Sequence, residues 1–206
     1  MTRTLSFLIG CLVLVTAALL AGTGTAAGTK PVPVTFVGDS VAASISYTPA
    51  ARKVLSRGLT VRLDLRVCRR LVTDGCAYQG STPPNTLQVV QQLGRSLGDV
   101  LIVYVGYNES SAGYGKGIDQ VMRAALRQGA RGVVWVTLRE ERDIYRQTNA
   151  TIRAAAKRWP ELRVADWNSY SNDKPWFSSD GLHMGAAGAE GLARFLRPYV
   201  LRVSSV

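Results

Sequence analysis

The stretch that decides the fold is Asp99-Val-Leu-Ile-Val-Tyr-Val105. It is almost wholly apolar, which is typical of a strand covered on both faces in a parallel sheet. A strand with one face in water would alternate apolar and polar residues instead. Residues 32–37 form a second apolar run, which ends at Gly38 and predicts another buried strand.

Predicted strands and helices alternate along the rest of the chain. Further strands are expected at residues 59–67, 133–137 and 162–166, and helices at 41–57, 85–97, 116–128, 148–159 and 188–200. Pro49 marks a kink or a boundary within the first helical segment, and Asn85 is the expected cap of the second. This alternation predicts an α/β fold: a flavodoxin-like, three-layer α/β/α domain with a central parallel sheet of about five strands.

The chain begins with the charged, apolar and small-residue order of a secretory signal peptide. Cleavage is expected after Ala27, so residues 1–27 are predicted to be the signal and residues 28–206 a single domain. An uncleaved anchor is the alternative, although the apolar stretch is short for a membrane span. A lipoprotein with Cys11 as its anchor is disfavoured, because Cys11 lies inside that stretch. The predicted location is secreted or associated with the cell envelope.

Two cysteines, Cys68 and Cys76, remain after the predicted cleavage. In an exported protein an even pair indicates a disulfide, which here closes a small loop, and two buried thiols are the alternative. One histidine and the lack of a Cys-x-x-Cys motif argue against a metal site. We therefore expect neither a metal nor a cofactor.

The net charge is +11. Nucleic acid is a conceivable partner for so basic a surface, but no basic motif interleaved with aromatic residues supports it. We expect no nucleic-acid partner. Attraction to an anionic cell envelope, or solubility alone, explains the charge more economically, and the domain is expected to be a monomer. The basic residues crowd one region: Arg52, Lys53, Arg57, Arg62, Arg66, Arg69 and Arg70.

Two short motifs supply the parts of a nucleophilic site. Ser40 follows the first predicted strand in Gly38-Asp39-Ser40, and the only histidine closes Asp180-Gly-Leu-His183. A serine, a histidine and an aspartate form a nucleophile, its general base and the group that orients the base. Ligands of open parallel sheets bind beyond the carboxyl ends of the strands. We expect Ser40, Asn108, the segment 137–141 and the Asp180–His183 loop to meet there.

These motifs, together with Gly106-Tyr-Asn-Glu109, resemble in order and spacing the SGNH/GDSL hydrolases over essentially the whole mature chain. Arg66-Val-Cys-Arg69 and Asp166-Trp167 are similar to segments of exported bacterial members and of SGNH domains attached to membrane acyltransferases. The resemblance implies a serine esterase that acts without metal or cofactor. It also implies O-acetyl esters on a carbohydrate or cell-envelope glycan as substrates. An O-acyltransferase, or a non-catalytic envelope-binding domain of the same fold, is the alternative.

The catalytic roles follow from chemistry and from the resemblance together. Ser40 is expected to be the nucleophile, presented at the amino end of a helix whose dipole favours negative charge. His183 would move the proton, and Asp180 would hold the His183 nitrogen that faces away from Ser40. Asp180 could also serve as a cap or turn residue. Asp39 is expected to organise the nucleophile turn by hydrogen bonding.

The resemblance also implies an oxyanion hole. Asn108 matches the family's side-chain donor, and the Ser40 N–H would be a second donor. The third donor of the family is a backbone N–H, usually of a glycine, and the matching position here is Cys68. Gly75 and Gly80 are the alternatives for that role.

Several further residues flank these motifs. Tyr107, Trp176 and Phe177 are candidates for the wall of an acyl or leaving-group pocket, and packing in the core is the alternative. Arg139 could bind an anionic or sugar substrate, or belong to a solvated charged loop.

Overall fold

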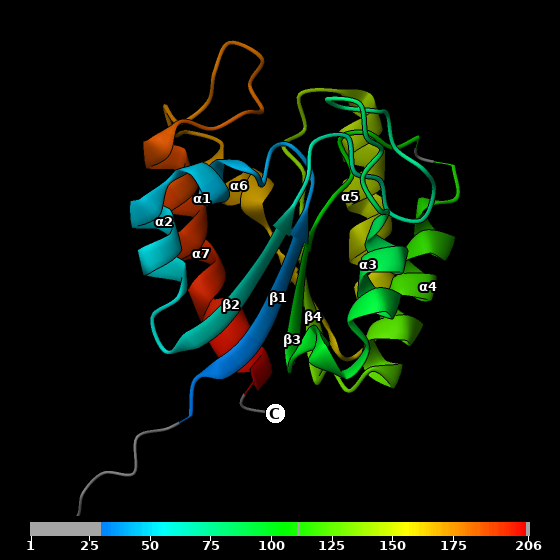
Figure 1. Cartoon of the computed structure of the whole chain (residues 1–206). Helices are drawn as coiled ribbons and strands as arrows, with labels where there is room; N and C mark the ends of the chain where they lie inside the picture. Colours follow the sequence, from blue (N-terminus) through cyan, green and yellow to red (C-terminus); the bar gives the residue numbers. More distant parts are fainter. Residues whose placement is uncertain (1–29, 111, 205–206) are drawn as a thin grey trace, which may run out of the picture.

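The computed structural model describes residues 30–110 and 112–204, so the predicted signal peptide lies outside the described residues. Five parallel strands form one sheet in the order β2-β1-β3-β4-β5 (Figure 1). The strands are β1 (Val32–Gly38), β2 (Leu59–Leu65), β3 (Val100–Tyr104), β4 (Gly132–Val136) and β5 (Leu162–Ala165). The strand order reverses between β1 and β3, which is where ligands bind in sheets of this kind.

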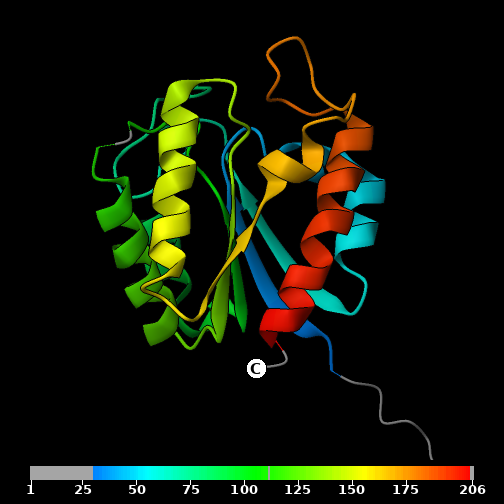
Figure 2. The same ribbon diagram turned by 180° about the vertical axis from the view of Figure 1, so that it is seen from behind.

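Helices cover both faces of the sheet, which confirms the expected three-layer α/β/α architecture (Figures 1 and 2). Helices α1, α2 and α7 lie on one face, and α3, α4 and α5 lie on the other. No helix within residues 30–110 and 112–204 is long and apolar enough to cross a membrane. The helices are α1 (Ser44–Tyr47), α2 (Pro49–Leu55), α3 (Thr86–Leu93), the 3₁₀ helix η1 (Gly94–Leu97), α4 (Tyr114–Arg127), α5 (Asp143–Ala156), α6 (Trp167–Ser171) and α7 (Ala186–Ser204).

Strand β3 explains why the sheet has two covered faces. All five of its residues are buried. Val100, Ile102 and Tyr104 pack into the core beside α7, whereas Leu101 and Val103 pack into the core beside α4. Because successive side chains of a strand point to opposite faces, an apolar run without alternation needs a helical layer on each side.

The observed helix boundaries show which sequence signals were sufficient to predict where a helix begins. Pro49 is the first residue of α2, a position where its missing N–H breaks no helical hydrogen bond. Asn85 caps α3 in a capping box, because its side chain accepts from the Gln88 N–H and the Gln88 side chain accepts from the Asn85 N–H. Helix α5 begins at Asp143, five residues before the expected start. Helices α1 and α6 are too short for a periodic pattern to predict them.

The segment between β2 and α3 is fixed at its base. Cys68 and Cys76 form the predicted disulfide. Arg69, counted by sequence among the surface cations, is instead fully buried. Its guanidinium donates to the carbonyl oxygens of Pro84 and Gly38 and to the Asp64 carboxylate. A buried charge is tolerated only with such hydrogen-bond and ion-pair partners. Through them, Arg69 connects both ends of the segment between β2 and α3 to the end of β1.

Candidate active site

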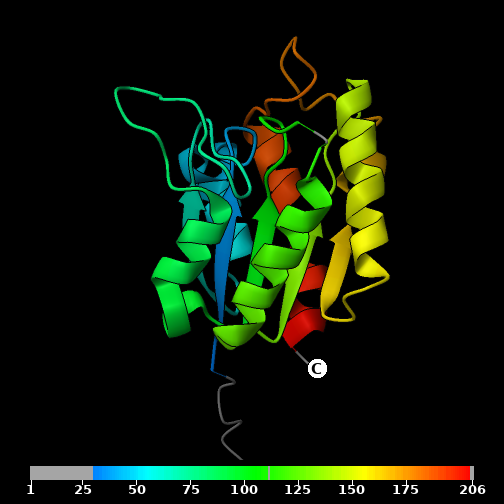
Figure 3. The same cartoon turned by 90° about the vertical axis from the view of Figure 1, so that its right-hand side faces the viewer.

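Ser40, His183 and Asp180 form one continuous series of hydrogen bonds. The Ser40 hydroxyl lies 3.1 Å from His183 Nε2, and His183 Nδ1 lies 2.6 Å from Asp180 Oδ2. Ser40 stands in the turn after β1, and the other two residues lie in the loop before α7, at the end of the sheet where the strand arrows point (Figures 1 and 3). The structure therefore brings Ser40 together with two residues that lie 140 and 143 positions further along the sequence.

Asp180 both orients His183 and shapes its own loop. Its Oδ1 accepts the N–H groups of Leu182 and His183 and the Ser178 hydroxyl. Desolvation raises the pKa of Asp180, but the hydrogen bonds from the His183 ring, these N–H groups and Ser178 outweigh it. The resulting pKa lies well below the usual range of an aspartate. Both of the roles considered for Asp180 are thus compatible with the geometry.

The charge on Asp180 fixes the tautomer of His183. An ionised carboxylate is an acceptor only, so Nδ1 must carry the hydrogen and Nε2 of a neutral ring is left to accept from Ser40. About half of each side chain in this pair is exposed, 50% for His183 and 46% for Asp180. Such an arrangement can activate an alcohol as a nucleophile in a site that water and a substrate can reach.

The helix expected to begin at Ser40 does not do so. Ser40 lies in a turn, and α1 begins only at Ser44 and is four residues long. A helix dipole grows with the number of aligned peptides, so the predicted dipole assistance is wrong. The hydrogen bonds of Asp39 hold this turn instead.

Asp39 is fully buried and joins two turns, as its expected organising role requires. Its Oδ1 accepts the Val41 N–H at 3.1 Å, and its Oδ2 accepts the N–H groups of Gly106 and Tyr107 at 3.1 and 3.2 Å. Burial raises the pKa of Asp39 to about 6, although these hydrogen bonds and the nearby His183 lower it. The carboxylate therefore fastens the turn of Ser40 to the turn after β3.

Two backbone N–H groups at this edge are available to a ligand. Within the described residues, neither the Ser40 N–H nor the Cys68 N–H has a protein acceptor. The Asn108 amide donates one hydrogen to the Arg69 carbonyl at 3.2 Å, which leaves its second hydrogen unused. These are the three donors that the resemblance implies for an oxyanion hole.

The backbone of Cys68 explains how it can stand where a glycine is usual. Its φ of 66° lies in the left-handed region that glycine adopts most readily. The alternatives have other reasons to be glycine: a Cβ on Gly75 would collide with the Cys68 carbonyl oxygen, and Gly80 has a φ of 78° at the tip of a hairpin. These observations favour Cys68 as the third donor.

The expectation that Arg139 belongs to a solvated charged loop is wrong. Its side chain is only 11% exposed. Its Nε donates to the Gly181 carbonyl at 2.8 Å, and Nη1 donates to the Ser171 carbonyl at 3.0 Å. Nη2 pairs with Glu141 at 2.7 Å, and the guanidinium lies 3.9 Å from the centre of the Phe177 ring. Its donors are occupied by the protein, so Arg139 acts as a clamp on the loop that carries Asp180 and His183.

The three aromatic candidates make contacts that favour core packing. The Tyr107 hydroxyl lies 3.0 Å from that of Tyr104 and accepts the Arg139 N–H at 2.8 Å. Trp176 stacks on buried Trp167 with ring centres 5.8 Å apart, and Phe177 lies against Arg139.

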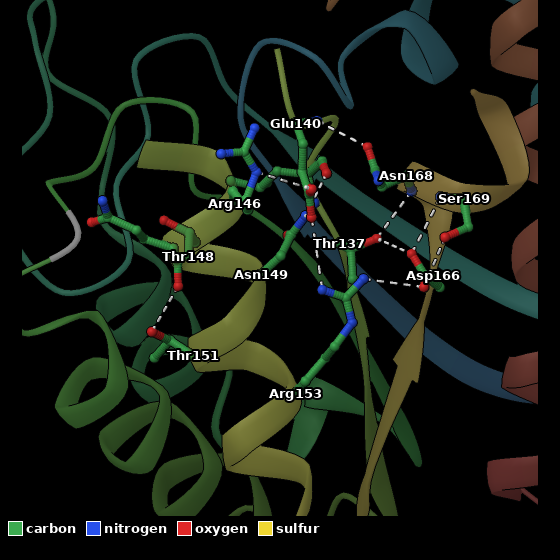
Figure 4. A network of polar contacts seen from close by, with 12 residues as sticks. Thr137, Glu140, Arg146, Thr148, Asn149, Thr151, Arg153, Asp166, Asn168 and Ser169 are labelled. Carbon is green, nitrogen blue, oxygen red and sulfur yellow. Dashed lines mark hydrogen bonds and ion pairs between the residues drawn. The ribbon is translucent and has the colours of Figure 1, made fainter. Parts of the chain in front are cut away.

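A polar network between the loop after β4, α5 and the start of α6 was missed by sequence reasoning (Figure 4). Thr137 donates to Asp166 at 3.1 Å, and the Glu140 N–H donates to the Asn168 side chain at 2.9 Å. Arg153 bridges Glu140 and Asp166 at 3.7 and 3.1 Å. The loop after β4 is therefore fastened to α6. The network is made of isolated polar residues of five different types. They follow no regular spacing in the sequence, so no pattern predicted their contacts.

No protein-family model matches the sequence, and no curated protein matches it. Solved structures are similar in fold. One is a carbohydrate acetylesterase family member from Sinorhizobium meliloti, with 14% identity over 84% of this chain and 99% of that one, at a TM-score of 0.66. Another is a Clostridium thermocellum family 3 carbohydrate esterase, with 15% identity over 84% and 97% of the two chains, at a TM-score of 0.63. At this identity the similarity shows a shared fold.

The buried Asp39 carboxyl predicts a pH-dependent stability. The pKa of Asp39 is about 6 in the folded chain and about 4 in the unfolded chain. Its contribution to the stability of the folded state is therefore fully present below pH 4, where the carboxyl is protonated, and is lost as the pH rises through 6. The difference in free energy of unfolding between wild type and Asp39→Asn should change by about 3 kcal/mol across this window. Urea titrations at pH 4 to 7 measure it. A carboxyl carbon of Asp39 that titrates near pH 4 by NMR would contradict the prediction.

The clamp predicts a local loss of order in an Arg139 variant. Hydrogen bonds from a charged group contribute about 1.5–3 kcal/mol each, so Arg139→Ala should speed amide hydrogen exchange in residues 176–185 by about tenfold or more. Arg131→Ala removes an exposed arginine at the opposite end of the sheet and serves as the matched control. Equal exchange in the two variants would show that Arg139 does not hold the loop.

Proposed function

We propose that this chain is an exported serine esterase of the SGNH/GDSL type. The observation that carries the proposal is the hydrogen-bonded series from Ser40 through His183 to Asp180, at the carboxyl edge of the sheet. A structural histidine would need neither a serine at one ring nitrogen nor a carboxylate at the other. The sequence motifs and the fold shared with carbohydrate esterases point to the same chemistry.

The first half-reaction forms an acyl-enzyme. The Ser40 oxygen attacks the ester carbonyl carbon while His183 Nε2 takes the serine proton, and Asp180 stabilises the imidazolium through Nδ1. The carbonyl oxygen becomes an oxyanion facing the N–H groups of Ser40 and Cys68 and the free hydrogen of the Asn108 amide. Collapse of this intermediate breaks the carbon–oxygen bond of the ester, and His183 returns the proton to the departing alcohol.

The second half-reaction releases the acid. His183 takes a proton from water, the resulting hydroxyl attacks the acyl carbon, and Ser40 leaves with the proton returned by His183. The half-exposed His183 ring is open to water, which favours hydrolysis. Transfer of the acyl group to a sugar hydroxyl would follow the same steps with that hydroxyl in place of water.

The substrate we propose is an O-acetyl ester on a carbohydrate of the cell envelope. The resemblance to wall- and glycan-modifying proteins supports this choice, as does the fold shared with carbohydrate esterases. Removal of the predicted signal would take only Arg3 from the charged residues and leave a net charge of +10. So basic a domain would be attracted to an anionic envelope over the screening distance of about 8–10 Å at physiological ionic strength.

The nucleophile assignment predicts that Ser40→Ala and His183→Ala each remove nearly all hydrolysis of p-nitrophenyl acetate. Because the two residues act as a unit, the double variant should be little worse than either single one. Ser46→Ala, six residues further along, is the matched control and should keep full activity. Half of the wild-type kcat in a folded Ser40→Ala protein would rule out Ser40 as the nucleophile.

The oxyanion assignment predicts a loss in kcat for Asn108 variants. Asn108→Ala should lower kcat by about 10²–10³-fold with little change in KM, because the donor acts on charge that develops in the transition state. Asn108→Asp keeps the shape but places a negative charge beside the oxyanion, so it should be worse than alanine. A raised KM at unchanged kcat would assign Asn108 to substrate binding instead.

A further inference from the structure

A cavity of about 530 Å³ lies at the carboxyl end of β2, the strand next to β1. It lies between the end of α1, the end of β2 and the segment that follows β2, which projects beyond the strand ends in Figure 3. Its wall is joined to the nucleophile turn, because the Arg66 N–H donates to the carbonyl of Gly38, two residues before Ser40. The lining residue Val67 also precedes Cys68 directly, so the cavity borders the segments that carry Ser40 and Cys68.

Exposed tyrosines gather at this cavity. Tyr47 is 78% exposed and Tyr78 is 48% exposed, and both line it. Among the described residues only four large hydrophobic side chains are exposed, and these are two of them. The two tyrosines come from elements distant in sequence. Solvent-exposed aromatic side chains that gather around one cavity are typical of a surface that binds a ligand.

The cavity also offers polar side chains, of which Arg66 is held only weakly by the protein. The Arg66 side chain is 67% exposed, and among the described residues its one ion pair is with Asp64 at 3.5 Å. Buried Arg69 already holds the same Asp64 oxygen at 2.8 Å, so Arg66 is the weaker partner and its guanidinium is open to a ligand. Gln79 and Thr82 add neutral polar groups to the lining.

The aromatic wall is held in a defined position. Tyr78 and Ser81 exchange two backbone hydrogen bonds, at 2.9 and 3.2 Å, around a two-residue turn. Both turn residues, Gln79 and Gly80, have positive φ, as a tight hairpin of this length requires. A non-glycine residue kept in that region is strained, and such strain is retained mainly at functional positions.

This combination suits a sugar ring. A pyranose has an apolar face of C–H groups that stacks on an aromatic ring, and an edge of hydroxyls that hydrogen-bonds to side chains such as Arg66 and Gln79. An acyl chain would need an enclosed apolar pocket, which an open cavity with an exposed guanidinium does not provide. We propose that this cavity binds a pyranose unit of the glycan whose neighbouring ester lies at Ser40. The inference rests on the proposed esterase function.

The test compares a large and a small substrate in the same variants. Tyr47→Ala and Tyr78→Ala should each lower kcat/KM for O-acetylated xylohexaose, or for O-acetylated glycan strands of peptidoglycan, by about ten- to a hundredfold. Hydrolysis of p-nitrophenyl acetate should stay within about twofold, because that ester reaches Ser40 without the cavity. Tyr47→Phe keeps the ring and should retain activity on the glycan, whereas Tyr47→Leu should not.

A binding measurement separates failure of this inference from failure of the esterase proposal. Ser40→Ala should bind the same acetylated glycans by calorimetry, and adding Tyr47→Ala should weaken binding by the same factor. If the chain hydrolyses neither substrate but binds in this ring-dependent way, the esterase proposal fails and the sugar site stands. Equal losses on the small and large esters, or binding indifferent to Tyr47 and Tyr78, would overturn the sugar site while leaving the esterase in place.

Discussion

The site depends first on the buried carboxylate of Asp39. It lies where the strand order reverses, between β1 and β3, and its two oxygens accept N–H groups from the turns that follow both strands. Moving a carboxylate out of water is unfavourable, which is why its pKa is raised to about 6. The three backbone hydrogen bonds offset part of that penalty and place the segments of Ser40 and Asn108 side by side.

A second set of hydrogen bonds, made by Arg139, positions the loop that carries Asp180 and His183. Arg139 extends from the end of β4 and holds the Gly181 carbonyl, between Asp180 and His183. The loop after β4 is in turn fastened to α6. The nucleophile and its base thus belong to separately anchored segments, and the 3.1 Å contact between Ser40 and His183 is where the two meet. A weakness in either anchor would misalign the pair without changing a reacting group.

Much of this organisation could be predicted from sequence because its signals are local or repeated. The apolar run of β3 specifies a sheet covered on both faces, and strand ends of a parallel sheet converge whatever the details of the helices. The contacts of Arg139 could not be predicted, because an arginine among charged neighbours gives no sign that it is 11% exposed. The same holds for Arg69, whose burial depends on carbonyls far along the chain. Where the nucleophile helix would begin was also misjudged, since four-residue α1 has no periodicity to read.

The most direct test of the account is the position of a covalent label. A serine-directed fluorophosphonate should react once per chain, and mass spectrometry of the digested protein should place the adduct on Ser40. Unfolded protein and His183→Ala should remain unlabelled under the same conditions, because only the hydrogen-bonded serine is activated. An adduct on another serine, or a folded wild-type chain that does not react, would contradict the proposal that Ser40, His183 and Asp180 work as one nucleophilic site.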